Sequence, residues 1–202
     1  MIKKFLLFTV LIGFGLMAQI SEAGVNIGET APDFTLTDTN GVAHSLSQYK
    51  GKFVVLEWFN YDCPFVHKHY DGGNMQGLQK EYTGKDVVWL SINSSAEGKE
   101  GFYSPEETNA MSKETGAAPT AILLDSDGKV GKLYGAKTTP HMFVISQQGV
   151  LIYQGAIDSK PSADSADIAT SVNYVKQALD EAIAGKAVSE PSTKSYGCSV
   201  KY

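Results

Sequence analysis

The sequence contains no arginine: all of its 17 basic residues are lysines, against 22 acidic residues. A mechanism that needs a planar guanidinium fork to bind an oxygen anion therefore has no residue to supply it. The formal net charge is −5, which excludes the strongly basic surface typical of proteins that bind nucleic acids. We therefore expect no nucleic-acid partner.

Cysteine is scarce as well, with only Cys63 and Cys198 in 202 residues. Two cysteines exclude a disulfide-dense scaffold, and their wide separation excludes the clustered spacing of a structural zinc site. They leave room for one intramolecular disulfide. Apolar residues make up 43% and charged residues 19% of the chain, which is the composition of an ordinary globular domain.

The chain also lacks an apolar run long enough to span a bilayer. Residues 5–17 are almost wholly apolar, which is shorter than the roughly 20 residues that a membrane helix needs. Two lysines precede this run, and small residues at Ser21 and Ala23 follow it, so the pattern predicts a secretory signal peptide over residues 1–23. We expect a periplasmic or secreted protein, with no membrane association after cleavage. In such compartments disulfides form and persist.

The order of predicted elements indicates an α/β domain over residues 24–187, followed by a polar tail over residues 188–202 that carries Cys198. We expect a central mixed β-sheet flanked by helices, with an N-terminal β-hairpin. The predicted elements are a hairpin over 34–44, strands at 53–59, 86–92 and 121–124, a hairpin over 142–153, and helices at 63–82, from 104 onward, and at 168–183, the first with a break at Gly72-Gly73.

Cys63 lies where the apolar strand ends and the next helix begins. At this junction the unpaired N–H groups and the dipole of the helix stabilise a thiolate, so we expect the pKa of Cys63 to fall. Pro64 suits the first helical turn. The alternative is a cysteine packed as a small apolar side chain. Glu57, within the strand, is interpreted either as a proton shuttle beside the thiol or as a partner of Lys52.

Three segments together resemble the thioredoxin fold in its AhpC/TSA, peroxiredoxin-like branch. They are the opening Ala31-Pro32-Asp33-Phe34, the strand-to-helix segment 58–64, and Thr139-Pro140 before a predicted hairpin. The run Cys-Pro-Phe-Val with Lys-His-Tyr at 63–70 and the ending Gly-Cys-Ser-Val-Lys-Tyr at 197–202 are similar to those of peroxiredoxin-like thioredoxin-domain proteins. The resemblance implies a thioredoxin-like fold, a cis Pro140 that faces Cys63, and thiol-dependent redox chemistry.

Two departures from the family limit what the resemblance implies. A local Cys-x-x-Cys dithiol needs a cysteine where this chain has Val66. The peroxiredoxin motif needs proline and threonine where this chain has Leu56 and Asn60, and its arginine is missing. We therefore do not expect peroxide reduction of the ordinary peroxiredoxin kind. Asn60 remains a candidate hydrogen-bond donor near the sulfur of Cys63.

Cys198 is then the only possible intramolecular partner of Cys63. The functional hypothesis is an exported thiol-dependent oxidoreductase or antioxidant, in which Cys63 is the nucleophile and Cys198 resolves the mixed disulfide or sulfenic acid. The partners would be a thiol or disulfide protein or a small-molecule oxidant, with a separate thiol reductant and no cofactor. The alternative role for this cysteine pair is a structural staple that ties down the tail.

Histidines supply a rival hypothesis of a redox-inactive or copper-binding module. Cys63 and His67 are four residues apart on one predicted helix, and His141 follows Pro140. Cysteine with histidine suits copper or zinc. The simpler interpretation, which we favour, assigns no metal site: His67 and His69 are solvated helix residues, or His67 tunes the thiolate.

Overall fold

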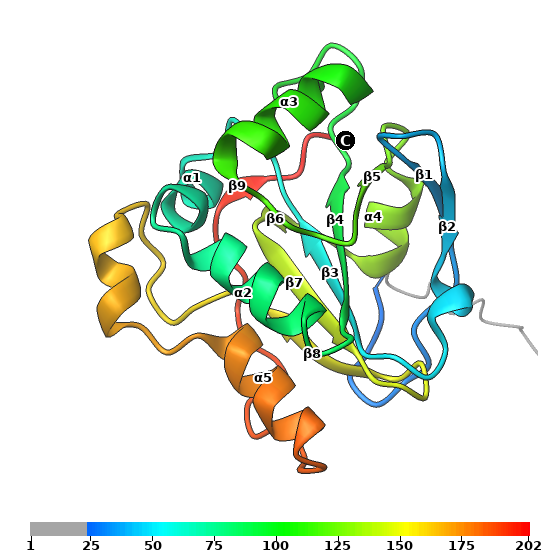
Figure 1. Ribbon diagram of the computed structural model, residues 1–202, viewed down its shortest axis with the longest axis vertical. Helices are drawn as coiled ribbons and strands as arrows, with labels where there is room; N and C mark the ends of the chain where they lie inside the picture. The colour runs from blue at the N-terminus through cyan, green and yellow to red at the C-terminus, as the bar shows by residue number, and fades with distance from the viewer. Residues whose placement is uncertain (1–23) are drawn as a thin grey trace, which may run out of the picture.

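The computed structural model of the chain describes residues 24–202. The predicted signal peptide and its cleavage site lie outside these residues. Figure 1 shows the elements in their arrangement. In chain order they are β1 (Thr35–Asp38), β2 (Ala43–Ser45), η1 (Leu46–Tyr49), β3 (Val54–Trp58), α1 (Pro64–Asp71), α2 (Asn74–Thr83), β4 (Val88–Asn93), α3 (Pro105–Thr115), β5 (Ala121–Leu124), α4 (Lys129–Tyr134), β6 (Thr138–Thr139), β7 (His141–Ile145), β8 (Leu151–Gly155), η2 (Ser165–Thr170), α5 (Tyr174–Ile183) and β9 (Cys198–Ser199).

A seven-stranded mixed sheet in the order β2-β1-β5-β4-β3-β7-β8 forms the centre of the domain. Strands β3, β4 and β5 run parallel, which requires a crossover connection between each pair. The other neighbours pair antiparallel, including the β1–β2 hairpin. The predicted α/β class, the mixed sheet and the N-terminal hairpin are confirmed. A separate two-stranded pair joins β6 to β9.

Strand β3 is buried along its whole length because apolar layers cover both faces of the sheet. Val54, Leu56 and Trp58 pack into the core layer that includes residues of α4. Val55 faces the other layer, which contains residues of α2 and α5. Successive side chains of a strand point to opposite faces, so a continuous apolar run suits this central position. The two layers fix the end of β3, after which Cys63 follows.

The last predicted helix, at 168–183, is wrong in its first third. The structure has a 3-10 helix over Ser165–Thr170 and begins α5 only at Tyr174. Asn173 is the N-cap of α5, and its side chain accepts a hydrogen bond of 2.9 Å from the backbone N–H of Lys176. Val172 lies within the predicted helical range, but in the structure it precedes α5 and is exposed. A local cap therefore prevails over apolar periodicity at this point.

Two turns of the chain test the predicted helix boundaries further. The predicted break in the helix 63–82 is confirmed, because Gly73 adopts a left-handed φ of 69° between α1 and α2. Helix α4 was not predicted. It follows the turn at Asp125, whose carboxylate accepts hydrogen bonds from the backbone N–H groups of Val130 and Gly131. That buried cap is specified by tertiary packing, whereas the sequence there shows only a turn pattern.

The tail, residues 188–202, packs against the domain although it lacks helical or strand periodicity. Figure 1 shows it returning from α5 past α1 to the pair β6–β9. Glycines make room for it: a Cβ atom at Gly155 would lie 2.3 Å from Thr193 Oγ1, and one at Gly131 would lie 2.4 Å from the hydroxyl of Tyr202. The domain surface is thus shaped to hold this segment.

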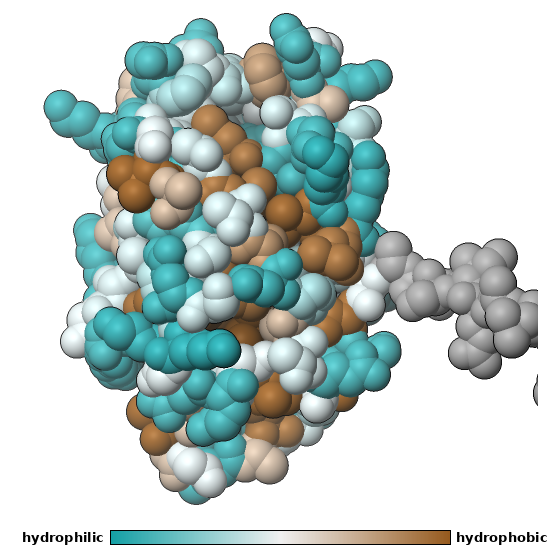
Figure 2. Space-filling view, turned by 90° about the vertical axis from the view of Figure 1, so that its right-hand side faces the viewer, coloured by the Kyte–Doolittle hydropathy of each residue, from teal (hydrophilic) through white to brown (hydrophobic). Residues whose placement is uncertain are grey.

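Figure 2 shows apolar side chains on one face, interrupted by hydrophilic ones. Within residues 24–202, no helix has both the length and the apolar character needed to cross a membrane.

Two helical glycines give a matched test of how closely the tail packs. Ala at Gly77 meets open space, so Gly77→Ala should raise the free energy of unfolding by about 0.5–1 kcal/mol through helix propensity. Gly131→Ala should not show this gain, because its Cβ atom displaces Tyr202. Urea unfolding measures both values. Equal gains at the two positions would contradict the packing of Tyr202 on α4.

Candidate active site

Cys63 is the N-cap residue of α1, and Pro64 occupies the first helical turn as predicted. The backbone N–H of Cys63 donates a hydrogen bond of 3.1 Å to the carbonyl of Asn60, which closes the turn between β3 and α1. The side chain is 0% exposed. Its thiol donates a hydrogen bond of 3.0 Å to the carbonyl oxygen of Thr139. The thiol therefore lies between the start of α1 and the loop before β7.

That loop contains a cis peptide bond between Thr139 and Pro140, as the resemblance implied. The loop also brings Cys198 to the site. Thr139 pairs with Cys198 in the antiparallel register of β6 and β9. Cys63 and Cys198 are 135 positions apart in the sequence. Both contact the backbone of Thr139.

The environments of the two thiols are unequal. Burial raises the pKa of Cys63, but hydrogen bonds from the Cys198 thiol, the Thr139 hydroxyl and the backbone N–H groups of Cys198 and Val66 outweigh burial and hold that pKa below its usual value. Burial and the neighbouring Cys63 sulfur raise the pKa of Cys198 to about 12. The site thus favours a Cys63 thiolate beside a protonated Cys198.

The side-chain hydroxyl of Thr139 is a hydrogen-bond donor beside Cys63. This hydroxyl is buried without a hydrogen-bond partner in the neutral site, and it faces Cys63 closely enough to stabilise the thiolate and lower the pKa of that thiol. A buried hydroxyl without a partner is costly, and the cost is relieved when a thiolate forms beside it. The side chain of Thr139 thus favours ionisation of Cys63, a role that the sequence did not indicate.

The side chain of Asn60 hydrogen-bonds to loop backbone groups and not to the sulfur of Cys63. Its side-chain amide donates to the carbonyl of Glu100 over 3.1 Å, and its amide oxygen accepts from the backbone N–H of Asp62 over 2.8 Å. A Cβ atom at Gly101 would lie only 2.2 Å from Asn60 Oδ1. The structure therefore replaces the expected Asn60–sulfur contact with a clamp that ties the 59–63 turn to the 100–101 loop.

The histidines have separate environments. His67 is 53% exposed and its Nδ1 atom lies 3.6 Å from Asp71, in agreement with the solvated interpretation. His69, which was also expected to be solvated, is instead buried. His141 Nδ1 accepts a hydrogen bond from the backbone N–H of Lys137. Across residues 24–202, no three His, Cys, Asp or Glu side chains are placed to hold a metal ion.

Glu57 is fully buried on the α2 side of the sheet. Its carboxyl group accepts hydrogen bonds from four side chains, and burial raises its pKa. The donors, at 2.7–3.1 Å, are Trp89 Nε1, Ser91 Oγ, Tyr70 Oη and Gln79 Nε2. Its predicted alternative partner is wrong, because Lys52 pairs with Asp86 over 2.6 Å.

Sequence reasoning missed a second polar cluster beside the site. Lys68 and Asp158 form a buried ion pair at 2.8 Å, and Tyr196 of the tail hydrogen-bonds to both. Asp158 also caps a turn, since its carboxylate accepts a hydrogen bond from the backbone N–H of Lys160. The only sequence signal for this cluster was the Lys-His-Tyr run at 68–70, which is similar to that of peroxiredoxin-like thioredoxin-domain proteins. The run did not indicate which residues Lys68 would contact.

A model of the AhpC/TSA family matches residues 27–154, more than half of the chain. The chain belongs to the AhpC/TSA family. It is 29% identical to the thioredoxin-like protein YneN of Bacillus subtilis, over 83% of this chain and 99% of that one. It is 28% identical to the thiol-disulfide oxidoreductase ResA of Geobacillus thermodenitrificans, over 63% of this chain and 81% of that one.

A solved structure shares the fold of this chain. An uncharacterized conserved protein from Geobacillus kaustophilus superimposes with a TM-score of 0.74 at 28% identity, over 88% of this chain and 92% of that one. The central mixed sheet flanked by helices is thus the thioredoxin-like fold that the resemblance implied.

The donors around Cys63 give a test based on pH. Cys198→Ala and Thr139→Val should each raise the pKa of Cys63, because each removes a hydrogen bond that stabilises the thiolate. The pH profile of alkylation by iodoacetamide, followed at Cys63 by mass spectrometry, measures the change. Thr37→Val, an exposed position on β1, is the control. Profiles that coincide with that of the unchanged protein would contradict the donor role.

Proposed function

We propose that the chain is a thiol-dependent oxidoreductase in which Cys63 is the nucleophile and Cys198 the resolving thiol. The observation that carries the proposal is the pairing of Thr139 with Cys198, which sets a thiol of lowered pKa against one of raised pKa. A thiolate attacks a disulfide, and the partner that stays protonated retains its proton until the second step. Relatives named as thiol-disulfide oxidoreductases support the same class of chemistry.

With a disulfide substrate the reaction has two steps. The Cys63 thiolate attacks one substrate sulfur, the substrate S–S bond breaks, and the other substrate sulfur leaves as a thiolate. Cys198 then attacks the Cys63 sulfur of this mixed disulfide and releases the second substrate thiol, which takes up the proton of Cys198. The substrate gains two electrons and the protein is left with a Cys63–Cys198 disulfide. A separate thiol reductant restores the two thiols.

Peroxide reduction is the second candidate activity, favoured by membership of the AhpC/TSA family. Here Cys63 takes one oxygen atom, giving a sulfenic acid and hydroxide, and the Cys198 thiol displaces water to form the same disulfide. No guanidinium is available to hold the peroxide. We therefore place disulfide reduction first and a slow antioxidant activity second.

The working compartment follows from the predicted signal peptide. We propose that the protein acts in the periplasm or outside the cell, where its partners are disulfide-bearing proteins or small-molecule oxidants and a separate thiol reductant. Such compartments allow the Cys63–Cys198 disulfide to persist between encounters. Asn60, Pro64, Thr139 and Pro140 are proposed to shape the site around the two cysteines, while His67, on the exposed side of α1, is proposed only as a neighbour.

The test compares Cys63→Ser and Cys198→Ser with the unchanged protein, using oxidised glutathione and, separately, hydrogen peroxide. Cys63→Ser should lose disulfide reduction almost entirely. Cys198→Ser should stop after one step and accumulate a glutathione adduct on Cys63. Trypsin separates the two cysteines into the peptides 53–68 and 195–201, so mass spectrometry detects their linkage directly.

Each result has a distinct meaning. A linked peptide pair with turnover in the unchanged protein supports the catalytic pair. A linked pair without turnover of either substrate would mean that the disulfide is a structural staple. Absence of the linked peptides after oxidation would overturn the resolving role of Cys198.

A further inference from the structure

Access to Cys63 is blocked by the tail in this structure. The Cys63 side chain is fully buried, and the strand β9 lies across the loop that holds it. The approach is very close: a Cβ atom at Gly197 would lie 2.0 Å from the carbonyl oxygen of Thr139. A substrate sulfur therefore cannot contact Cys63 while this part of the tail is docked.

Backbone hydrogen bonds hold the tail both before and after the segment that covers Cys63. Before it, the backbone N–H of Thr193 donates to the carbonyl of Gln154 on β8 over 3.1 Å. After it, the backbone N–H of Val200 donates to the carbonyl of Lys137 over 3.2 Å. Between these two points the tail makes one side-chain attachment to buried charged groups, through Tyr196, two residues before Cys198.

Tyr196 is held by the buried cluster beside α1. Its hydroxyl donates to Asp158 Oδ1 and lies 3.2 Å from Lys68 Nζ, which donates to it. His69 Nε2 also lies 3.2 Å from this hydroxyl. The ring of Tyr196 packs edge-on against that of Phe65 at a centroid distance of 5.8 Å. Phe65 is two residues after Cys63, so the same tyrosine contacts the helix that carries the nucleophile.

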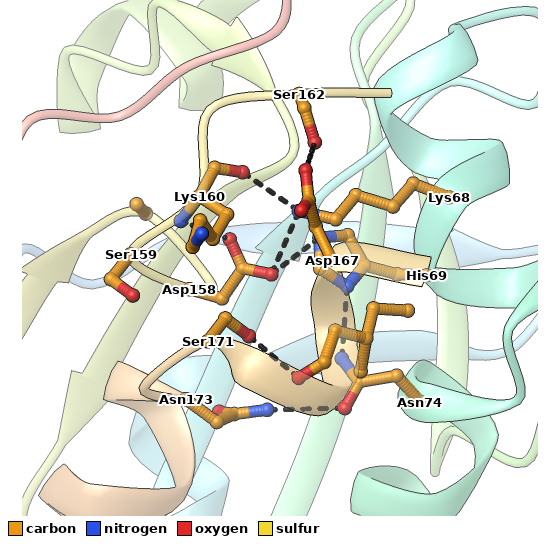
Figure 3. Close-up of polar contacts among 12 residues, drawn as sticks. Lys68, His69, Asn74, Asp158, Ser159, Lys160, Ser162, Asp167, Ser171 and Asn173 are labelled. Atoms are coloured by element: carbon orange, nitrogen blue, oxygen red, sulfur yellow. Dashed lines mark hydrogen bonds and ion pairs between the residues drawn. The ribbon is translucent and has the colours of Figure 1, made fainter. Parts of the chain in front are cut away.

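The cluster itself is rigidly built. Lys68 and Asp158 are 0% and 1% exposed at the side chain, and Lys68 Nζ also donates to the carbonyl of Lys160 over 2.7 Å. Figure 3 shows these groups converging from α1 and from the loop after β8. Burial lowers the pKa of His69 to about 4, so this imidazole is neutral at ordinary pH. The Lys68 charge has Asp158 as its buried counter-ion, and hydrogen bonds to charged groups are stronger than those between neutral groups.

We propose that Tyr196 is a positioning residue that sets the equilibrium between a docked and a released tail. Docked, the tail presents Cys198 to Cys63 and shields Cys63 from substrate; released, it opens Cys63 to substrate. This inference rests on the proposed function for the meaning of the cysteine pair. The equilibrium itself is a property of the fold and is measured without turnover.

The proposal predicts two opposite effects of one hydroxyl group. In Tyr196→Phe the tail should be released more often, so a bulky thiol reagent should reach Cys63 faster. Cys198 should at the same time contact Cys63 less often, so the equilibrium constant for forming the intramolecular disulfide should fall. A hydrogen bond to a charged group supports a change of about tenfold in each quantity.

The first measurement is the rate at which Cys63 reacts with a polyethylene glycol maleimide in the full-length protein. Cys198→Ser is the background, so that only one thiol reacts. Tyr196→Phe in this background should react about tenfold faster. Tyr49→Phe is the matched control: it also removes a tyrosine hydroxyl hydrogen bond, to His44, but near the β2 edge, away from β9. Tyr196→Ala, which removes the ring too, should react faster still.

The second measurement is the equilibrium between the Cys63–Cys198 disulfide and a glutathione redox buffer, with both cysteines present. Tyr196→Phe should lower the equilibrium constant for disulfide formation about tenfold, while Tyr49→Phe should leave it unchanged. Equal maleimide rates in Tyr196→Phe and its background would overturn the positioning role. If no intramolecular disulfide forms in any variant, the proposed function fails, and the maleimide rates alone decide the role of Tyr196.

Discussion

The environment of Cys63 depends on the antiparallel pairing of Thr139 with Cys198. This short pairing places the second thiol, its backbone N–H and the loop hydroxyl around one sulfur, and it removes that sulfur from solvent. Burial alone would disfavour the thiolate, so ionisation of Cys63 depends on the donors that the tail and the loop provide. The environment of the Cys63 thiol is therefore completed by two segments that are far from it in the sequence, and neither is part of a local dithiol motif.

The AhpC/TSA fold supplies most of this arrangement without the tail. Apolar layers cover both faces of β3, and the turn after this strand leads directly to Cys63, the N-cap residue of α1. The loop with Pro140 enters β7, which pairs with β3, and in this chain it brings the Thr139 carbonyl within 3.0 Å of the Cys63 sulfur. The chain has Val66 where a local Cys-x-x-Cys motif would have its second cysteine, and in the proposed function the tail supplies that cysteine as Cys198.

Elements that follow from local chemistry could be predicted from the sequence. The buried strand, the helix start at Cys63-Pro64 and the break at Gly73 each depend on a few adjacent residues, and the structure confirms them. The polar cluster could not be predicted, because Lys68 meets its partners Asp158 and Tyr196 across 90 and 128 residues. Neither a helix period nor a composition rule indicates that a lysine on α1 is buried, since lysine is rarely buried without a partner.

The position of the covering segment has a consequence for how the molecule is made. Ribosomes synthesise a chain from its N-terminus, and domains begin to fold as they emerge. Residues 196–199 are added more than 130 residues after Cys63. The sheet strands β1 to β8 are complete before the segment that closes over the sulfur exists. During this interval the Cys63 thiol of a nascent chain lacks the segment that covers it in the folded structure, so its exposure to solvent ends only when the last residues of the chain have been added.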